Sequence, residues 1–217
     1  MDNKPSVIIY DLDGTIIDSS SIVRSILSQL RVEYGLSANL PENFEPYLSM
    51  GGVDMVSGAL GIPASVAQEQ LDIFREIYFD TPTDLASIYP FALDTMSKAL
   101  TAGIRLCLFT NKPRQLVDKI IKELRIEQFF EVSLAGGDLN TRKPHPNNIF
   151  WCLTSLKISA QETILIGDST VDQRSASAAS IPFWFFSGGY DDGIDLNTVD
   201  QYFDCHSKLP EILGLPG

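Results

Sequence analysis

The chain has 217 residues, 44% of them hydrophobic and 20% charged, which is enough to bury the core of one domain with an insertion, or of two domains. It carries 16 Lys and Arg against 28 Asp and Glu, a net charge of −12. Nucleic acids and anionic membranes are therefore disfavoured as partners, because both must be met by positive charge. A small anion can still be a ligand, provided that the few basic side chains are concentrated at one place.

The N-terminal stretch MDNKPSVIIYD lacks a basic region followed by a long apolar core, and the longest apolar runs, VIIY and FWFF, are too short to cross a bilayer. We therefore expect a cytoplasmic protein that does not bind membranes. The three cysteines, Cys107, Cys152 and Cys205, are an odd number with no CxxC spacing. Their sequence neighbours do not complete a metal-ligand set, so we interpret them as structural thiols.

In chain order, the first predicted element is a buried strand at residues 7–10, where β-branched and aromatic residues follow one another without interruption. Similar apolar runs predict strands at residues 104–109, 129–135, 163–167 and 181–186. Helical spacing lies between these runs, for example at Leu116, Ile120 and Leu124. The alternation predicts an α/β fold, a doubly wound Rossmann-like parallel sheet with its ligand site at the carboxyl ends of the strands.

Residues 16–88 interrupt this alternation. A helix is predicted from residue 20 to its end at Gly35, and a second is expected to open at Pro63. The stretch DTPTDLASIYP is punctuated by two prolines and resembles a return linker. We predict a helical insertion at 16–88 within a core domain formed by residues 1–15 and 89–217.

Polar side chains follow several of the predicted strands. Asp11 and Asp13 follow the first strand. Thr110 and Asn111 follow the second, and Asp168 follows the fourth. Because the carboxyl ends of parallel strands share one edge of the sheet, these groups are expected to converge.

A cation is needed where three carboxylates gather, because their mutual repulsion would otherwise disfavour ionisation. An oxygen-only ligand set of this kind suits Mg²⁺. Lys143, in TRKPHP, adds positive charge in front of a predicted helix. Together with Thr110 and Asn111 it offers donors to the oxygens of a phosphoryl group in transfer. One carboxylate could attack phosphorus, and a second could protonate the leaving alcohol.

The chain resembles the haloacid dehalogenase (HAD) superfamily, whose four motifs occur in order as DLDGT at 11–15, Thr110, Lys143 in RKPHP, and GDSTVD at 167–172. The resemblance implies that Asp11 is the nucleophile and a metal ligand. It implies that Asp13 is the acid/base and binds the metal through its backbone carbonyl, and that Asp168 is the third metal-binding residue. Thr110 and Lys143 would bind the transferring phosphoryl group.

Further roles follow from the same resemblance. Phosphate or substrate binding is implied for Leu12, Gly14, Thr15, Asn111 and Lys112, and support of the metal site or of Lys143 for Ser169 and Asp172. The insertion would be the family's cap, with Gly51 and Gly52 in a glycine-containing loop, at 47–61, that is lowered onto the substrate. Within the superfamily, FTNKP, AGGDLNTRKPHP and LPEILGLP are most similar to bacterial phosphoglycolate phosphatases.

The expected function is Mg²⁺-dependent hydrolysis of a small phosphomonoester, with 2-phosphoglycolate as first choice, by a monomer or homodimer. Two alternatives stay open: a phosphatase or phosphomutase for sugar phosphates or other small metabolites, and a non-catalytic module that binds phosphorylated ligands or a protein. His145 is expected to cap a helix or orient Lys143, and His206 to lie at the surface.

Overall fold

The uninterrupted apolar run at the start of the chain forms the central strand of a parallel sheet. The structure is a computed structural model that describes residues 4–215. Within that range six strands pair in the order β3-β2-β1-β4-β5-β6, and every pairing is parallel. The strands are β1 (Val7–Tyr10), β2 (Arg105–Pro113), β3 (Val132–Gly136), β4 (Thr163–Gly167), β5 (Phe183–Phe186) and β6 (Gln201–Phe203). The prediction of a doubly wound parallel sheet is confirmed.

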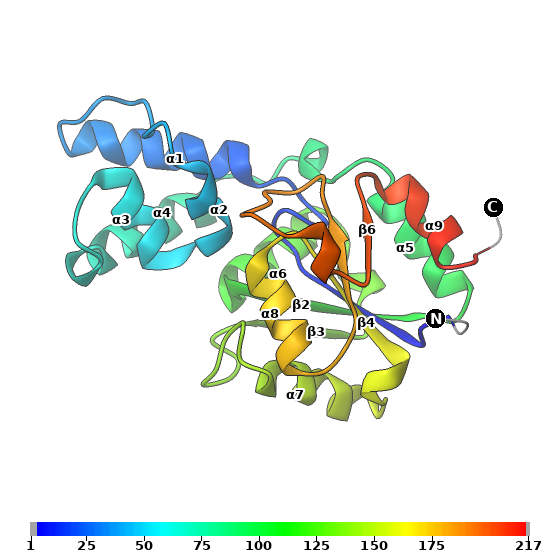
Figure 1. Ribbon diagram of the computed structural model, residues 1–217. Coiled ribbons are helices and arrows are strands. Elements are labelled where there is room, and N and C mark those ends of the chain that lie inside the picture. Colours follow the sequence, from blue (N-terminus) through cyan, green and yellow to red (C-terminus); the bar gives the residue numbers. More distant parts are fainter. Residues whose placement is uncertain (1–3, 216–217) are drawn as a thin grey trace.

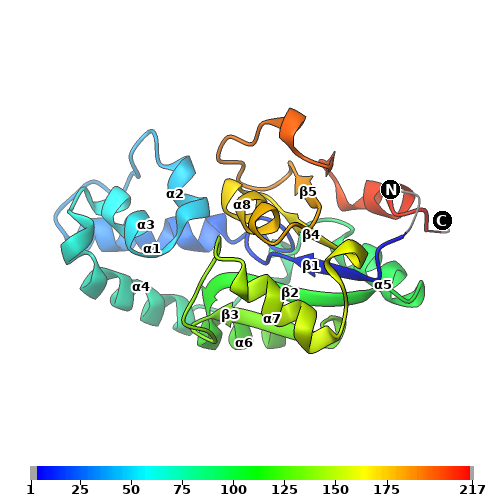
Figure 2. The same cartoon turned by 60° about the horizontal axis from the view of Figure 1, so that its bottom comes forward.

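Helices cover both faces of the sheet because successive side chains of a strand point to opposite faces (Figure 2). Ile8 and Tyr10 of β1 pack in one hydrophobic core, whereas Val7 and Ile9 pack in the other. The first core includes residues of α5 (Ala92–Thr101), α6 (Arg114–Glu123) and α9 (Leu209–Ile212). The second includes residues of α7 (Asn147–Leu156) and α8 (Thr170–Ala178).

Four further helices form a group beside the sheet, at the left of Figure 1. They are α1 (Ser20–Glu33), α2 (Glu45–Met50), α3 (Gly52–Leu60) and α4 (Gln68–Asp80). The two segments that join this group to the rest run side by side, since Ile17 pairs with Ile88 and the backbone N–H of Asp18 donates to the carbonyl of Ser87 at 2.7 Å. Among residues 4–215, no helix has the length and apolar character needed to span a membrane.

Four local predictions were wrong. The helix expected to open at Pro63 begins at Gln68, because the regular buried face of Leu71, Phe74 and Tyr78 starts only after a single 3₁₀ turn at Ala64–Val66. The predicted glycine loop at 47–61 is instead mostly helical, with α2 and α3 meeting at Gly51.

The third correction concerns His206, which is 1% exposed rather than at the surface. Its ring packs against Phe186 and Phe203, with ring centroids 4.6 and 5.5 Å away. The second strand also runs further than expected, so Thr110 and Asn111 lie in an irregular last part of β2 rather than beyond it.

Candidate active site

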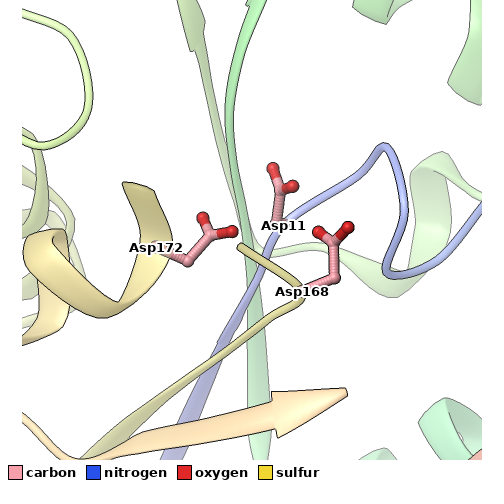
Figure 3. Close-up of side chains that lie close together, drawn as sticks. All are labelled: Asp11, Asp168 and Asp172. Carbon is pink, nitrogen blue, oxygen red and sulfur yellow. The ribbon is translucent and has the colours of Figure 1, made fainter. Parts of the chain in front are cut away.

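Three carboxylates from separate elements meet at the carboxyl edge of the sheet. Asp11 follows β1, Asp168 follows β4, and Asp172 lies in the first turn of α8. Each offers one oxygen that lies within 4.8 Å of the other two, and Figure 3 shows the three side chains converging from these elements. The sequence-based expectation that polar groups gather at this edge therefore holds for the segments after β1 and β4.

Lys143 supplies the positive charge at this cluster. Its Nζ donates to Oδ1 of Asp11 and to Oδ1 of Asp172, both at 2.7 Å, and its side chain is 3% exposed. Burial alone would lower the pKa of Lys143, but the two carboxylates raise it above its ordinary value. The lysine therefore stays charged. Its hydrogen bond to Asp11 involves Oδ1, and no hydrogen bond from a described residue reaches the other carboxylate oxygen, Oδ2.

Asp168 is fixed by its neighbours on both oxygens. Thr15 Oγ1 donates to Oδ1 at 3.2 Å, and the backbone N–H of Tyr190 donates to Oδ2 at 2.9 Å. A Cβ at Gly14 would overlap the Asp168 carboxylate, so the left-handed glycine (φ 78°) allows the close approach. Burial, followed by the charges of Asp172 and Asp11, raises the pKa of Asp168 well above its ordinary value.

The donor set fits a hard divalent cation. The Lys143 ammonium group contacts only two of the three carboxylates, and burial raises the pKa of Asp11 to about 7 despite the opposing effect of Lys143. A divalent cation would relieve this deficit of positive charge, and carboxylate oxygens are the ligands that Mg²⁺ prefers. The cluster is therefore a candidate magnesium site.

Asp13 points to a different set of partners. Its Oδ1 accepts hydrogen bonds from Ser19 Oγ at 2.5 Å and from Lys112 Nζ at 2.7 Å, and its carboxylate is not part of the metal cluster. Lys112 Nζ also lies 4.4 Å from the centroid of the Tyr78 ring in α4. The sequence-based expectation placed the backbone carbonyl of Asp13, not its carboxylate, on the metal, so the position of the carboxylate is compatible with that expectation.

The two polar residues in the last part of β2 shape the backbone around Lys143 and Lys112. Asn111 uses both ends of its amide on Lys143: Oδ1 accepts from the backbone N–H at 2.8 Å and Nδ2 donates to the carbonyl at 3.3 Å. Thr110, which is 4% exposed, accepts from the backbone N–H of Lys112 through its Oγ1 at 3.1 Å. Both line the same cavity as Asp11.

Asp172 and Ser169 form the start of α8. Ser169 caps the helix, and its Oγ donates to Oδ2 of Asp172 at 2.6 Å. Both carboxylate oxygens of Asp172 therefore have a donor, Ser169 and Lys143. This is the geometry expected of a residue that supports the site.

The cavity above the cluster has a volume of about 320 Å³. Its lining includes Asp11, Asp13, Lys143 and Asp168 from the sheet side and Gly51 and Gly52 from the helical group. Three residues of the first motif, Leu12, Gly14 and Thr15, do not line it. The side chain of Leu12 is in the hydrophobic core. Gly14 leaves room for the Asp168 carboxylate, and Thr15 donates a hydrogen bond to it.

The loop after β5 supplies two site residues that sequence reasoning missed. Besides its backbone contact with Asp168, Tyr190 accepts a hydrogen bond from the backbone N–H of Ser19 at 2.9 Å. Asp192 accepts from the backbone N–H of Thr170 at 2.7 Å and from Ser49 Oγ in α2 at 3.2 Å. The sequence feature that could have indicated these residues is the stretch SGGYDDG, because it directly follows a predicted strand and therefore lies at the edge where the site was expected.

The comparisons with known proteins agree with this geometry. The family model described as haloacid dehalogenase-like hydrolase matches residues 8–186. A phosphoglycolate phosphatase from Photorhabdus laumondii subsp. laumondii is 29% identical, over 96% of this chain and 92% of the relative. Another from Pseudomonas syringae pv. tomato is 27% identical, over 97% of this chain and 81% of the relative.

Solved structures show the same fold. A haloacid dehalogenase-like family hydrolase from Streptococcus pneumoniae superposes with a TM-score of 0.80 at 21% identity, over 96% of this chain and 98% of that one. A variant of CbbY from Rhodobacter sphaeroides, in complex with xylulose-(1,5)bisphosphate, superposes with a TM-score of 0.74 at 19% identity. The match covers 94% of this chain and 96% of that one. The predicted enzyme class, a phosphoric monoester hydrolase, agrees with the phosphatases among its relatives. By the extent of the family match and the agreement in fold, the chain belongs to the haloacid dehalogenase-like hydrolase family.

Proposed function

We propose that this protein is a Mg²⁺-dependent phosphatase that hydrolyses 2-phosphoglycolate through a phosphoryl group carried on Asp11. The observation that carries the proposal is the position of Lys143, whose ammonium group contacts Asp11 and Asp172 beside Asp168, at a cavity large enough for a small ester. Asp11, Asp168 and the backbone carbonyl of Asp13 would hold the metal. When bound, Mg²⁺ supplies positive charge to the carboxylates and to the phosphoryl oxygens.

In the first step, Oδ2 of Asp11 attacks phosphorus. A bond forms between this oxygen and phosphorus, and the bond from phosphorus to the alcohol oxygen breaks. Asp13 gives a proton to the leaving alcohol, while the charge of Lys143 stabilises the oxygens of the transferring group. Lys143 stays protonated throughout, as its contacts with two carboxylates require.

In the second step, water attacks the phosphorus bound to Asp11. Asp13, now a carboxylate, takes a proton from this water, and the bond between phosphorus and Asp11 breaks. Inorganic phosphate leaves, and Asp11 and Asp13 return to their starting states. The hydrogen bonds from Ser19 and Lys112 to Oδ1 of Asp13 leave its other oxygen to carry the proton.

The choice of substrate is supported by size, charge and relatives. A cavity of about 320 Å³ lies at the small end of ligand sites. Residues 16–88 contain three Arg, no Lys and ten Asp or Glu, which disfavours a polyanion. Two relatives that align with most of this chain are phosphoglycolate phosphatases. We further propose that residues 16–88 act as a cap that closes over the bound ester.

The test is phosphate release from a panel of monoesters that includes 2-phosphoglycolate and sugar phosphates, with and without Mg²⁺. We expect Mg²⁺-dependent turnover that is greatest for 2-phosphoglycolate and is lost in Asp11→Asn. A preference for a sugar phosphate would favour the metabolite phosphatase or phosphomutase instead. Folded protein that turns over no ester, yet binds them, would favour a non-catalytic module.

A further inference from the structure

Helix α4 places two polar groups in a largely apolar wall of the active-site cavity. The wall contributed by α1 to α4 includes Leu48, Met55, Leu71 and Phe74. Among the described residues of this wall, Arg75 carries the only positive charge and Asp54 the only negative one. Arg75 and Tyr78 are three residues apart on α4, so they lie on the same side of the helix.

Tyr78 has a buried hydroxyl group with no well-formed hydrogen bond. The residue is 1% exposed and lines the cavity, and its Oη interacts with the nearby Lys112 and Ser19 but meets no described residue at full hydrogen-bond geometry. A buried hydroxyl that lacks a well-formed hydrogen bond costs free energy, so a ligand that completes the bond at a cavity wall is favoured. Burial raises the pKa of Tyr78 above its ordinary value, so the group is a hydrogen-bond donor at neutral pH.

Three other cations line the cavity: Lys143 and Lys112, which are paired with carboxylates, and Arg142, which is exposed and does not belong to α1 to α4. Lys143 is held by Asp11 and Asp172, and Lys112 by Asp13. By contrast, Arg75 has only a 3.5 Å contact with Asp72, with the two side chains 39% and 57% exposed. Such a surface pair is weak, so the Arg75 guanidinium can exchange it for a ligand at little cost.

The position of α4 also fits the direction in which a substrate would extend. The leaving oxygen must lie near Asp13, which protonates it. Lys112 Nζ contacts both the Asp13 carboxylate, at 2.7 Å, and the Tyr78 ring, at 4.4 Å from its centroid. The part of the substrate beyond the leaving oxygen therefore points toward α4.

We propose that Arg75 and Tyr78 form the subsite for the second anionic group of the substrate, so that the enzyme selects small phosphomonoesters bearing a carboxylate close to the ester oxygen. This inference rests on the proposed function. The guanidinium would pair with the carboxylate, and the Tyr78 hydroxyl would donate a hydrogen bond to it. The apolar side chains around them would exclude water and strengthen both contacts.

The experiment compares 2-phosphoglycolate with ethyl phosphate, which has a methyl group in place of the carboxylate. We expect Arg75→Gln to lower kcat/KM for 2-phosphoglycolate by about 10- to 100-fold, the range for losing a charge-assisted hydrogen bond, and to change that for ethyl phosphate less than about twofold. Tyr78→Phe should lower kcat/KM for 2-phosphoglycolate by roughly 3- to 10-fold. The controls are Lys122→Gln, an exposed charge outside the cavity, and Tyr10→Phe, which removes another buried hydroxyl without a well-formed hydrogen bond, one that does not line the cavity.

The subsite would be overturned if kcat/KM fell equally for both esters. It would also be overturned if the preference for 2-phosphoglycolate over ethyl phosphate were unchanged in both variants. A wild-type enzyme that does not distinguish the two esters, or an Arg142→Gln variant that alone removes the distinction, would overturn it as well. Calorimetric binding of both esters to Asp11→Asn with Mg²⁺ separates this inference from the proposed function. If no ester is turned over, the proposed function fails, and the subsite stands only if 2-phosphoglycolate binds more tightly and Arg75→Gln abolishes the difference.

Discussion

Asp11 is a buried carboxylate whose charge the surrounding side chains only partly compensate. Its pKa of about 7 in the folded, metal-free chain lies above the value of about 3.9 for an unfolded chain. Between these pH values the folded state binds more protons than the unfolded state. The contribution of Asp11 to stability is therefore fully present below about pH 4 and is lost as the pH rises through about 7.

Replacing Asp11 with Asn should stabilise the metal-free protein at pH 8 while abolishing turnover. We expect a gain of about 1–3 kcal/mol in the free energy of unfolding, since a neutral amide needs no compensating charge. The loss of stability between pH 5.5 and pH 8 should be smaller than in wild type, though not absent, because the pKa of Asp168 is raised in the same direction. Denaturant unfolding checks this, and an Asp11→Asn protein less stable than wild type at pH 8 would contradict it.

Lys143 is the counter-charge for two carboxylates, so its removal should cost both stability and rate. Lys143→Met leaves Asp11 and Asp172 without their shared donor, and we expect a loss of about 3 kcal/mol in metal-free unfolding free energy. The double variant with Asp11→Asn should lose less than this, because one of the stranded charges is gone. Turnover should fall by at least about 10²-fold, as for other preorganised charges at a transition state. A double variant that loses more stability than Lys143→Met alone would show that this charge is not what the lysine balances.

The secondary-structure elements differ in how well the sequence predicts them. Strands at 7–10 and 163–167 have the predicted bounds, because uninterrupted β-branched runs are typical of central parallel strands. The helix α3 was missed because its glycines and turn residues suggest a loop, while packing against α1 and α4 decides its structure. Similarly, the contact of Tyr190 with Asp168 depends on how a loop returns over the sheet, which local patterns do not encode.

His206 links the C-terminal part of the described chain to the loop that follows β1. Its Nε2 lies 2.8 Å from the carbonyl oxygen of Thr15, and burial lowers its pKa to about 4, from about 6.5 in an unfolded chain. The unfolded state binds more protons between these values, so this contribution is fully present above about pH 6.5 and is lost as the pH falls through about 4.

His206→Gln should therefore flatten the acid side of the stability profile. Between pH 7 and pH 4.5, we expect the unfolding free energy of wild type to fall by about 2 kcal/mol more than that of the variant. The reason is that the buried ring resists protonation, whereas the same ring in the unfolded chain is protonated. Urea unfolding at the two pH values measures the difference. Parallel losses in the two proteins would mean that protonation of His206 does not control the acid limb.

For the whole molecule, the arrangement of the helical group over the cavity suggests a hinge. Figure 1 shows α1 to α4 joined to the sheet by two neighbouring segments, and the pairing of Ile17 with Ile88 links them. Contacts between the helical group and the rest include polar ones, such as that from Ser49 to Asp192, and the packing of α4 against α6. Closure would have to exchange some of these contacts.

Limited proteolysis tests this motion. Mg²⁺ with a phosphate analogue should slow cutting within residues 16–20 and 81–88, because a closed cap would hold both segments in place. Cutting at the C-terminal end of the described chain, near residue 214, serves as the internal control. Equal rates at the two hinge segments with and without the ligands would argue against closure.

The proposed reaction depends most directly on a phosphoryl group carried by Asp11. Rapid acid quenching of the enzyme during turnover of 2-phosphoglycolate with Mg²⁺, followed by peptide mass spectrometry, should find one added phosphoryl group on the peptide that contains Asp11, and none in Asp11→Asn. A phosphoryl group found on another side chain, or steady turnover with no modified peptide at any quench time, would contradict it.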